Sequence, residues 1–337
     1  MRKRIAVVGG IPNPIGGVTS FIRRVVRLEN EVTHLFDLYP SGSKKLPEEF
    51  SGEFVCGVNK YVTLIRLFLF CLRDDIDFIH FNFSTPRALL LLLLLPKFRA
   101  KWGLTLHHGD LGGDLNSFFC TLLSRKIDVA LSLNHRQFQW YTRNALSKTL
   151  ERSCSYVEPS EPCPSVEFAE KVSGFKEKYN RIFVCSGYPT HIYNHFKAID
   201  LMGYYKNDLL VVCIYGGGPL VGEIELRVSR QENSLLVNGL SEDDFNFLLA
   251  NADLYLRLNS EDSFGIAVAD SVVLGTICIS TDVCPRYPGA VLISPFCTLV
   301  ELKNTVEDVF SESSDLRKAS GSFATFRYKR IRSLNYD

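Results

Sequence analysis

The chain has 337 residues, more than one hydrophobic core usually organises, so two domains of roughly 150 residues each are expected. Hydrophobic residues make up 46% of it, and 38 basic against 37 acidic side chains leave a net charge of +1. This balance argues against a protein that grips nucleic-acid phosphates nonspecifically. The ten cysteines contain no C-x-x-C pair, so we expect reduced thiols and neither a zinc site nor a redox motif.

The amino-terminal half predicts strands that alternate with helices. In chain order the segments are a strand at 4–10 (RIAVVGG), a turn into a helix at 16–28 (GGVTSFIRRVVRL), and strands at 32–39 (VTHLFDLY), 78–83 (FIHFNF) and 101–109 (KWGLTLHHG). The apolar stretch 5–8 is too short for the core of a signal peptide. We therefore expect a cytoplasmic protein.

A run of seven leucines, Leu89–Leu95, raises the question of a membrane span. Pro86 and Pro96 bracket the run, and its length is about half of the roughly 20 residues that a spanning helix needs. A buried helix between two strands is predicted instead, which is the unit of a parallel sheet.

The carboxyl-terminal half repeats the alternation. Its strand candidates are 181–187 (RIFVCSG), 208–218 (DLLVVCIYGGG), 234–239 (SLLVNG), 252–258 (ADLYLRL) and 276–282 (TICISTD). The sequence thus predicts an α/β protein with two Rossmann-like, doubly wound parallel-sheet domains that face a cleft. The weakest patterning, 157–180, opens with three prolines and is assigned to the linker. We place the domains at 1–160 and 175–337, with the last helix a candidate to return to the first domain.

Glycines cluster where strands end. Gly16 and Gly17 precede a helix, Gly216–Gly218 follow a strand, and Gly265 stands where another helix is expected to open. Each cluster taken singly is better explained as a turn that needs a positive φ. Neither G-x-G-x-x-G nor G-x-x-x-x-G-K-[ST] is present, which disfavours a dehydrogenase or a P-loop hydrolase.

Two aspartates stand out in residues 259–275 (NSEDSFGIAVADSVVLG). If the helix begins near Phe264 or Gly265, Asp262 lies at about the N-cap, which explains it without any function. Asp270 falls inside the helix among small apolar side chains and needs partners if it is buried. A ribose diol could supply two donors to such a carboxylate.

The spacing D-S-F-G-I-A-V-A-D at 262–270 resembles the E-x7-E signature of GT-B glycosyltransferases, especially retaining family 4 (glycosyltransferase group 1) of the O-antigen and surface-polysaccharide type. Further stretches resemble motifs of that family in the same order: GGVTSFI at 16–22, TLHHGD at 105–110, HFKAIDLM at 195–202, YGGGP at 215–219 and the run 237–262. The resemblance covers roughly residues 5 to 300.

The resemblance implies a nucleotide diphosphate-sugar bound mainly by the second domain and an acceptor bound by the first. Asp262 would face the hydroxyls of the donor sugar, Lys197 would neutralise the leaving diphosphate, and His108 would lie near the sugar or the acceptor. These three are the candidate catalytic residues. The candidate donor-binding residues are Gly16, Gly17, Gly218, Arg257, Phe264, Gly265, Ile266 and Asp270.

One position departs from the family pattern. Members commonly carry an arginine about five residues before the lysine, and residues 185–196 contain none. Arg257 could replace it, with Arg286 a weaker candidate. Because we place Asp262 and Lys197 in a cleft and not in the core, replacing either is expected to abolish turnover and leave the fold intact.

The function that the resemblance implies is a metal-independent, retaining transferase without a cofactor. The donor would be of UDP or GDP type, and the acceptor a glycan or lipid-linked oligosaccharide used for surface polysaccharide or lipopolysaccharide. The basic helix with Arg23, Arg24 and Arg27 is most simply a solvated face, yet it could also contact anionic lipid at the inner face of the plasma membrane.

Two alternatives stay open. A nucleotide-sugar 2-epimerase has the same two-domain architecture and would convert the donor without an acceptor. A noncatalytic subunit that binds sugar nucleotides or glycans would do neither reaction, and the missing arginine is compatible with it. The order of the transferase-like motifs favours the transferase.

Overall fold

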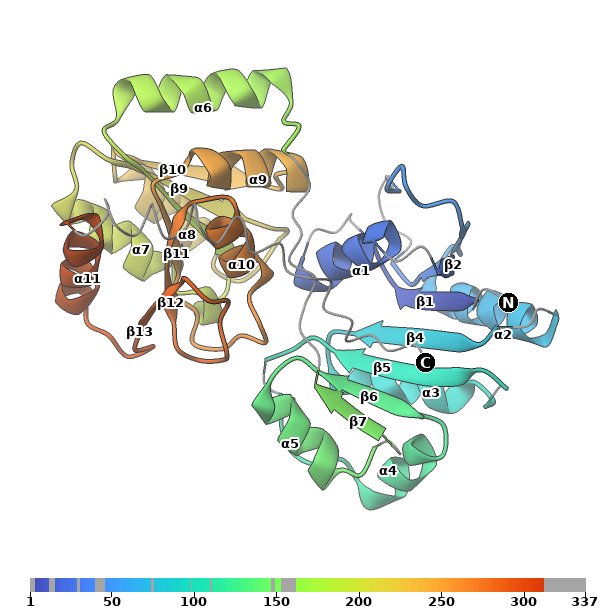
Figure 1. The fold of residues 1–337 in the computed structure, drawn as a ribbon. Helices are drawn as coiled ribbons and strands as arrows, with labels where there is room; N and C mark the ends of the chain where they lie inside the picture. The colour runs from blue at the N-terminus through green and yellow to red at the C-terminus, as the bar shows by residue number, and fades with distance from the viewer. Residues whose placement is uncertain are drawn as a thin grey trace. The chain divides into compact units, whose positions relative to one another are not determined.

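The computed structural model describes residues 4–11, 16–28, 31–39, 46–73, 76–97, 99–109, 111–146, 149–152 and 162–311. The chain forms two compact units, unit 1 in Met1–Tyr156 and unit 2 in Val157–Arg330 (Figure 1). The predicted domain boundaries, 1–160 and 175–337, stay a prediction. The last helix proposed from sequence falls outside the described residues.

The described strands of unit 1 form one parallel sheet of seven, in the order β3-β2-β1-β4-β5-β6-β7. The strands are β1 Ile5–Gly9, β2 Val32–Asp37, β3 Glu53–Cys56, β4 Phe78–Phe83, β5 Lys101–Leu106, β6 Val129–Ser132 and β7 Thr149–Arg152. The helices are α1 Gly17–Leu28, α2 Lys60–Arg73, the 3-10 turn η1 Pro86–Leu89, α3 Leu90–Leu94, α4 Ser117–Ser124 and α5 His135–Arg143. Strands β3, β6 and β7 had no sequence prediction.

Helices cover both faces of this sheet. Side chains of α2, η1, α3, α4 and α5 share one apolar core with one side of the strands, including Phe81 and Trp102. Helix α1 packs on the other side, where the Phe21 ring lies 6.4 Å from that of His80. Because neighbouring strand residues such as His80 and Phe81 point to opposite faces, the sheet is doubly wound.

The leucine run departs from its prediction. It forms the end of η1, all of α3 and the C-cap residue Leu95, and only Leu89, Leu92 and Leu95 are buried. Leu90 and Leu94 are 54% and 70% exposed. A helix that lies on a sheet buries one stripe only, so a uniform run of leucines still has an outward side. None of the described helices is both long and apolar enough to span a bilayer.

The predicted basic face of α1 is also different in the structure. Arg24 is buried, with an exposed fraction of 2%, whereas Arg23 and Arg27 are half-buried. Spacing alone placed all three arginines on one face of the helix. Arg24 belongs instead to the side that faces the protein, so α1 does not offer an unbroken basic face to a membrane.

The described strands of unit 2 form a six-stranded parallel sheet in the order β10-β9-β8-β11-β12-β13. The strands are β8 Ile182–Gly187, β9 Leu209–Ile214, β10 Ser234–Asn238, β11 Leu254–Arg257, β12 Ile277–Thr281 and β13 Val291–Ile293. The helices are α6 Val166–Lys178, η2 His191–Tyr193, α7 His195–Leu201, η3 Met202–Tyr204, α8 Val221–Ser229, α9 Glu242–Asn251, α10 Ile266–Val273 and α11 Leu299–Ser311.

Two apolar cores flank the sheet of unit 2. One includes Leu210 and Leu256 with α7, α8 and α11, and the other includes Val211 and Tyr255 with α6, α9 and α10. Neighbouring residues of one strand thus belong to opposite cores, as a doubly wound sheet requires. Part of the predicted linker, 157–180, is therefore wrong, because residues 166–178 form α6 and bury two side chains in the second core.

Polar side chains are buried on the α1 side of the first sheet. The ring Nε2 of His80 lies 2.8 Å from Thr105 Oγ1, and Nε2 of His107 lies 3.1 Å from Asn82 Oδ1. Burial lowers the pKa of His80 to about 3. Burial, with a smaller contribution from His80, also lowers the pKa of His107 to about 3. Both imidazoles are therefore neutral at physiological pH and act as hydrogen-bonding groups of the interior.

We expect the buried His80 to make unit 1 sensitive to acid. Its pKa is 6.5 when unfolded and about 3 when folded, so only the unfolded state takes up the proton between these values. The contribution of His80 to the free energy of unfolding should be fully retained above pH 6.5 and fall by about 1.4 kcal/mol per pH unit below it, and His107 should add a similar fall.

The measurement is urea unfolding across this pH range. His80→Gln should flatten the pH dependence by one proton, whereas His135→Gln, at an exposed residue of α5, should leave it unchanged. An unaltered slope in His80→Gln would contradict the assignment.

Candidate functional site

The site is built where the order of strands reverses in the sheet of unit 2. Strand β8, the first of the sheet, has β9 on one side and β11 on the other. Ser186 near the end of β8, Arg257 at the end of β11 and Thr281 at the end of β12 therefore lie at the same edge of the sheet. In open α/β sheets this edge, at the reversal point, is where ligands bind.

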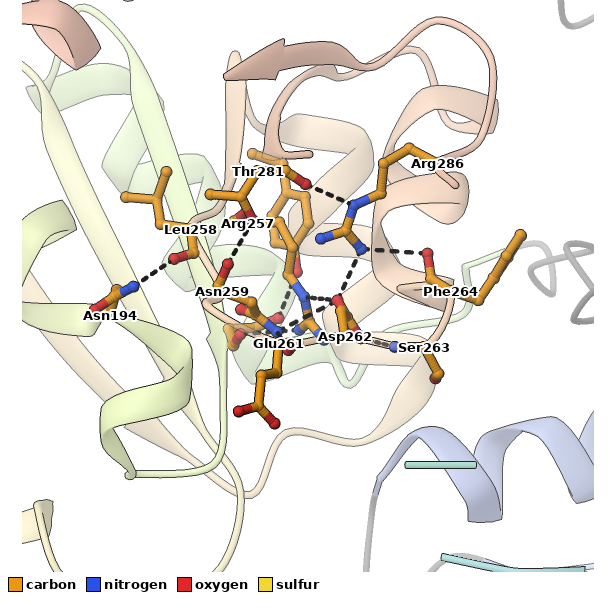
Figure 2. A network of polar contacts seen from close by, with 12 residues as sticks. Asn194, Arg257, Leu258, Asn259, Glu261, Asp262, Ser263, Phe264, Thr281 and Arg286 are labelled. Atoms are coloured by element: carbon orange, nitrogen blue, oxygen red, sulfur yellow. Dashed lines mark hydrogen bonds and ion pairs between the residues drawn. The ribbon is translucent and has the colours of Figure 1, made fainter. Parts of the chain in front are cut away.

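Two arginines converge on one carboxylate oxygen at this edge (Figure 2). Arg257 Nε donates to Asp262 Oδ2 at 2.9 Å, and Arg286 Nη1 donates to the same oxygen at 2.8 Å. Asn259 Nδ2 adds a third donor at 3.3 Å. We call Arg257, Asp262 and Arg286 the arginine cluster. The side chains are 11%, 10% and 1% exposed respectively, so these charges depend on one another and not on bulk water.

The electrostatics of the arginine cluster follow from its burial. Desolvation alone would raise the pKa of Asp262, but Arg257 and Arg286 outweigh it and lower the pKa to about 2. Desolvation disfavours the charge of Arg257, yet Asp262 and the neighbouring tyrosines raise its pKa well above the usual value. Asp262 is therefore ionised, and two guanidinium groups against one carboxylate leave the cluster with one net positive charge.

The contacts of Arg257 and Arg286 connect the cluster to the strand ends. Arg257 Nη1 donates to Ser186 O at 3.2 Å, and its guanidinium carbon lies 5.1 Å from the centre of the Tyr193 ring. Arg286 Nε donates to Thr281 O at 3.0 Å. The Nη2 of Arg286 is buried with no hydrogen-bond partner among the described residues, an uncommon state for a charged donor.

Helix α10 begins at Ile266, and its N-cap is Gly265, so the prediction that Asp262 caps this helix is wrong. Gly265 adopts φ 78°, and a Cβ atom there would lie 2.5 Å from Arg286 Nη1. Arg286 Nη1 also donates to Phe264 O at 3.3 Å. Glycine is required at this position by both the backbone conformation and the arginine packed against it.

The first turn of α10 presents its amide groups next to the arginine cluster. Phe264 and Ile266, which lie on either side of Gly265 in the sequence, are half-buried. The amides of a helix N-terminus point outward and carry positive partial charge, which favours an anion. Asp270, one turn further along, is only 3% exposed, so it lies on the side of α10 that faces the interior of unit 2.

The other predicted residues of unit 2 lie on neighbouring loops. Lys197, on α7, donates from Nζ to Cys297 O at 2.8 Å, which places its amino group at the loop before α11. Gly218 follows β9 and packs against Pro189, where a Cβ atom would meet the proline carbonyl oxygen at 2.8 Å. This packing explains why residue 218 is a glycine. Asn194, the N-cap of α7, donates to Leu258 O at 2.7 Å and ties that helix to the loop of the arginine cluster.

The predicted residues of unit 1 gather at the carboxyl edge of its own sheet. Gly16 and Gly17 begin α1 after β1, and the Gly16 carbonyl oxygen accepts from Ser20 N at 2.9 Å. A Cβ atom on Gly17 would meet no described residue within 4 Å. His108 follows β5 and is half-buried, and its carbonyl oxygen accepts from Gln137 Nε2 at 2.8 Å. The preceding residue, His107, packs against Phe21, with the centres of the two rings 4.8 Å apart.

Sequence reasoning missed the groups that surround the carboxylate. Arg286 was only a weaker substitute for a missing arginine, although it is the most buried member of the cluster. No feature of the sequence pointed to Tyr193 or Ser186, because their contacts with Arg257 depend on which strands are neighbours, and these strands are far apart in the sequence. Among the described residues no group of three or more His, Cys, Asp or Glu could hold a metal ion.

Comparison with solved structures gives matches along nearly the whole chain. HepE from Anabaena, solved in complex with UDP and glucose, has a TM-score of 0.71 at 11% identity, covering 97% of this chain and 95% of that chain. Sucrose-phosphate synthase from Thermosynechococcus elongatus has a TM-score of 0.69 at 13% identity, covering 95% and 94%. Trehalose 6-phosphate synthase from Burkholderia multivorans has a TM-score of 0.67 at 10% identity, covering 96% and 94%.

This chain has the fold of these proteins. The predicted class, α/β with two Rossmann-like parallel sheets of the GT-B kind, is therefore confirmed. No family model matches the sequence, and comparison with curated proteins gives no match either. Membership of family 4 and the O-antigen type stay predictions.

Replacing Asp262 should destabilise unit 2, contrary to the expectation from sequence that only activity would suffer. In Asp262→Asn, two buried guanidinium groups lose their counter-ion, and breaking a buried pair in this way costs about 3–5 kcal/mol. Thermal or urea unfolding measures the change.

The neighbouring Glu261→Gln removes an equal charge from a residue outside the arginine cluster and should change stability by less than about 0.5 kcal/mol. Equal stabilities of the two variants would show that the cluster is not a structural element.

Proposed function

We propose that the protein is a glycosyltransferase that moves a sugar from a nucleotide diphosphate-sugar to a glycan or lipid-linked acceptor with retention of configuration and without a metal. A UDP-type donor is the first choice, because the similar HepE structure was solved with UDP. We place the activity in surface polysaccharide synthesis, on the strength of the motif resemblance.

The observation that carries the proposal is the net positive arginine cluster beside the N-terminus of α10, at the reversal point of the sheet. A diphosphate is the ligand that suits this combination, since helix amides and a guanidinium each favour phosphate oxygens. We infer that the amides from Phe264 to Ile266 approach the diphosphate and the sugar.

The geometry gives Asp262 a different role from the one first inferred. Its Oδ2 already accepts from three side-chain donors, and its Oδ1 accepts from Ser263 N at 3.0 Å. We infer that Asp262 positions Arg257 and Arg286, and that the arginines face the negative charge that develops on the leaving diphosphate. Arg257 then replaces the arginine absent from residues 185–196.

The remaining roles stay as the resemblance implies them. We assign Lys197 to the diphosphate, His108 to the sugar or acceptor, and Asp270 to the ribose. Lys197 would have to exchange Cys297 O for phosphate, and Asp270 would have to become accessible from its buried position. We assign to Gly16, Gly17 and Gly218 a close approach of their backbone to the donor, which the lack of a side chain permits.

Two other functions remain as outcomes of the tests. A 2-epimerase would change the donor sugar without any acceptor, and a noncatalytic binding subunit would bind the donor and change nothing. The pairing of Asp262 with two arginines disfavours it as an acid or base, which counts against the epimerase.

UDP should raise the melting temperature of the purified protein in the absence of metal. A ligand that binds only the folded state stabilises it, by about 2.7 kcal/mol at one hundred times its dissociation constant. A thermal-shift series with UDP, GDP, CMP and ADP and their sugars, with and without magnesium, is the measurement. Stabilisation only with magnesium would contradict the metal-free proposal, and no stabilisation by any diphosphate would contradict the donor site.

Gly17→Leu should weaken UDP-glucose binding without loss of stability. No described residue lies within 4 Å of a Cβ atom at Gly17, so the described part of the fold accommodates the side chain, and leucine favours a helix by up to about 1 kcal/mol over glycine. If the backbone at Gly17 closes on the phosphates, the leucine keeps it away, and we expect an affinity about tenfold lower by calorimetry.

Gly174→Leu is the matched control, because Gly174 lies in helix α6 and a Cβ atom there also has no described neighbour within 4 Å. This control should bind UDP-glucose like the wild type. Wild-type affinity in Gly17→Leu would remove Gly17 from the donor site.

A further inference from the structure

One side of unit 1 exposes large apolar side chains in an ordered array. Helices α2 and α3 pack on the same face of the sheet, and both turn a second apolar stripe away from it. We call this stripe the outer apolar face. It consists of Tyr61, Ile65, Leu69 and Leu72 on α2 and Leu90 and Leu94 on α3.

The spacing shows that the exposure is systematic. Tyr61, Ile65 and Leu69 follow one another by four residues, so they line one side of α2, and with Leu72 they are 53% to 65% exposed. The opposite side of the same helix buries Leu64 and other core side chains. A surface helix ordinarily has a polar outer side, and contiguous exposed apolar patches mark interaction sites.

The segments that carry the outer apolar face are basic, although Asp74 and Asp75 follow α2 directly in the sequence. Residues 60–73 and 86–109 contain seven Lys or Arg and no Asp or Glu, although the whole chain is nearly neutral. Lys60 and Arg66 on α2, Arg87 on η1 and Arg99 after α3 are all exposed. Their long side chains can place apolar stems along the face and extend their charges beyond it.

We propose that the outer apolar face docks unit 1 onto the surface of an anionic lipid bilayer. The leucines, Ile65 and Tyr61 would enter the boundary between headgroups and acyl chains, and the surrounding Lys and Arg would contact lipid phosphates. This inference stands apart from the proposed transferase activity, since none of its residues belongs to the candidate site. It also replaces α1, whose Arg24 is buried, as the surface that faces a membrane.

A second copy of the chain fits the face less well. A two-fold contact would set the basic residues of the two copies against one another, with no acidic residue of α2 or α3 between them. The outer apolar face also borders a hollow of about 530 Å³ beside β3, lined in part by Arg66 and Leu69. Glu53 also lines this hollow, so the border of the face carries an acidic group on the β3 side. The excess of Lys and Arg on the segments that carry the exposed apolar side chains matches anionic lipid.

Vesicle co-sedimentation tests the proposal. The full chain should pellet with vesicles of phosphatidylglycerol and phosphatidylcholine and far less with phosphatidylcholine alone, and high salt should weaken the binding. The double variant Ile65→Gln, Leu69→Gln should partition about tenfold more weakly, because two half-exposed side chains no longer enter the apolar layer.

Leu226→Gln on α8 is the matched control, since Leu226 is exposed to a similar extent in unit 2 and should bind vesicles like the wild type. Melting temperatures confirm that the exposed substitutions leave the fold intact. Equal binding to both kinds of vesicle, no binding to either, or wild-type binding by the double variant would each overturn the proposal. A dimer by light scattering that the double variant dissociates would assign the face to a second copy instead.

Discussion

The pairing of buried charges at the reversal point of the second sheet constrains everything around it. A guanidinium or carboxylate in an interior position is stable only with partners at hydrogen-bond distance. Arg257 and Arg286 therefore fix Asp262, and through their other donors they fix the ends of β8 and β12. The loop between β11 and α10 has little freedom, and the position at which α10 begins follows from it.

This constraint explains why the glycine of the Phe264-Gly265 pair is needed in this chain. Arg286 occupies the space that a side chain on Gly265 would fill, and the same guanidinium contacts the carbonyl oxygen just before the helix. The amides at the start of α10 and the surplus positive charge of the arginine cluster are thus held together by one set of contacts. A site for an anion and the local stability of unit 2 have the same physical origin.

The fold could be predicted from sequence to a large extent, because parallel strands buried on both faces appear as short apolar runs between helices. Strands such as β6 and β7 escaped notice, since four residues carry too little periodicity. The position of the candidate loop was also predictable from Asp262 and Phe264. The partners of Asp262 were not, because Arg286 approaches from a different loop and only the strand order brings it near. Asp262 was therefore misassigned to a helix cap.

The leucine run shows more clearly what cannot be predicted from composition. Seven identical residues give no periodicity, so sequence alone cannot say which of them face the sheet, and a wholly buried helix was the natural expectation. The structure divides them by geometry: Leu92 contacts the core, whereas Leu94 faces outward. An outward leucine buries less apolar area against unit 1 than an inward one does, so packing accounts less well for its presence. The same holds for Ile65 and Leu69 on α2. Half-exposed apolar side chains on basic segments are what contact with an anionic surface that excludes water would require.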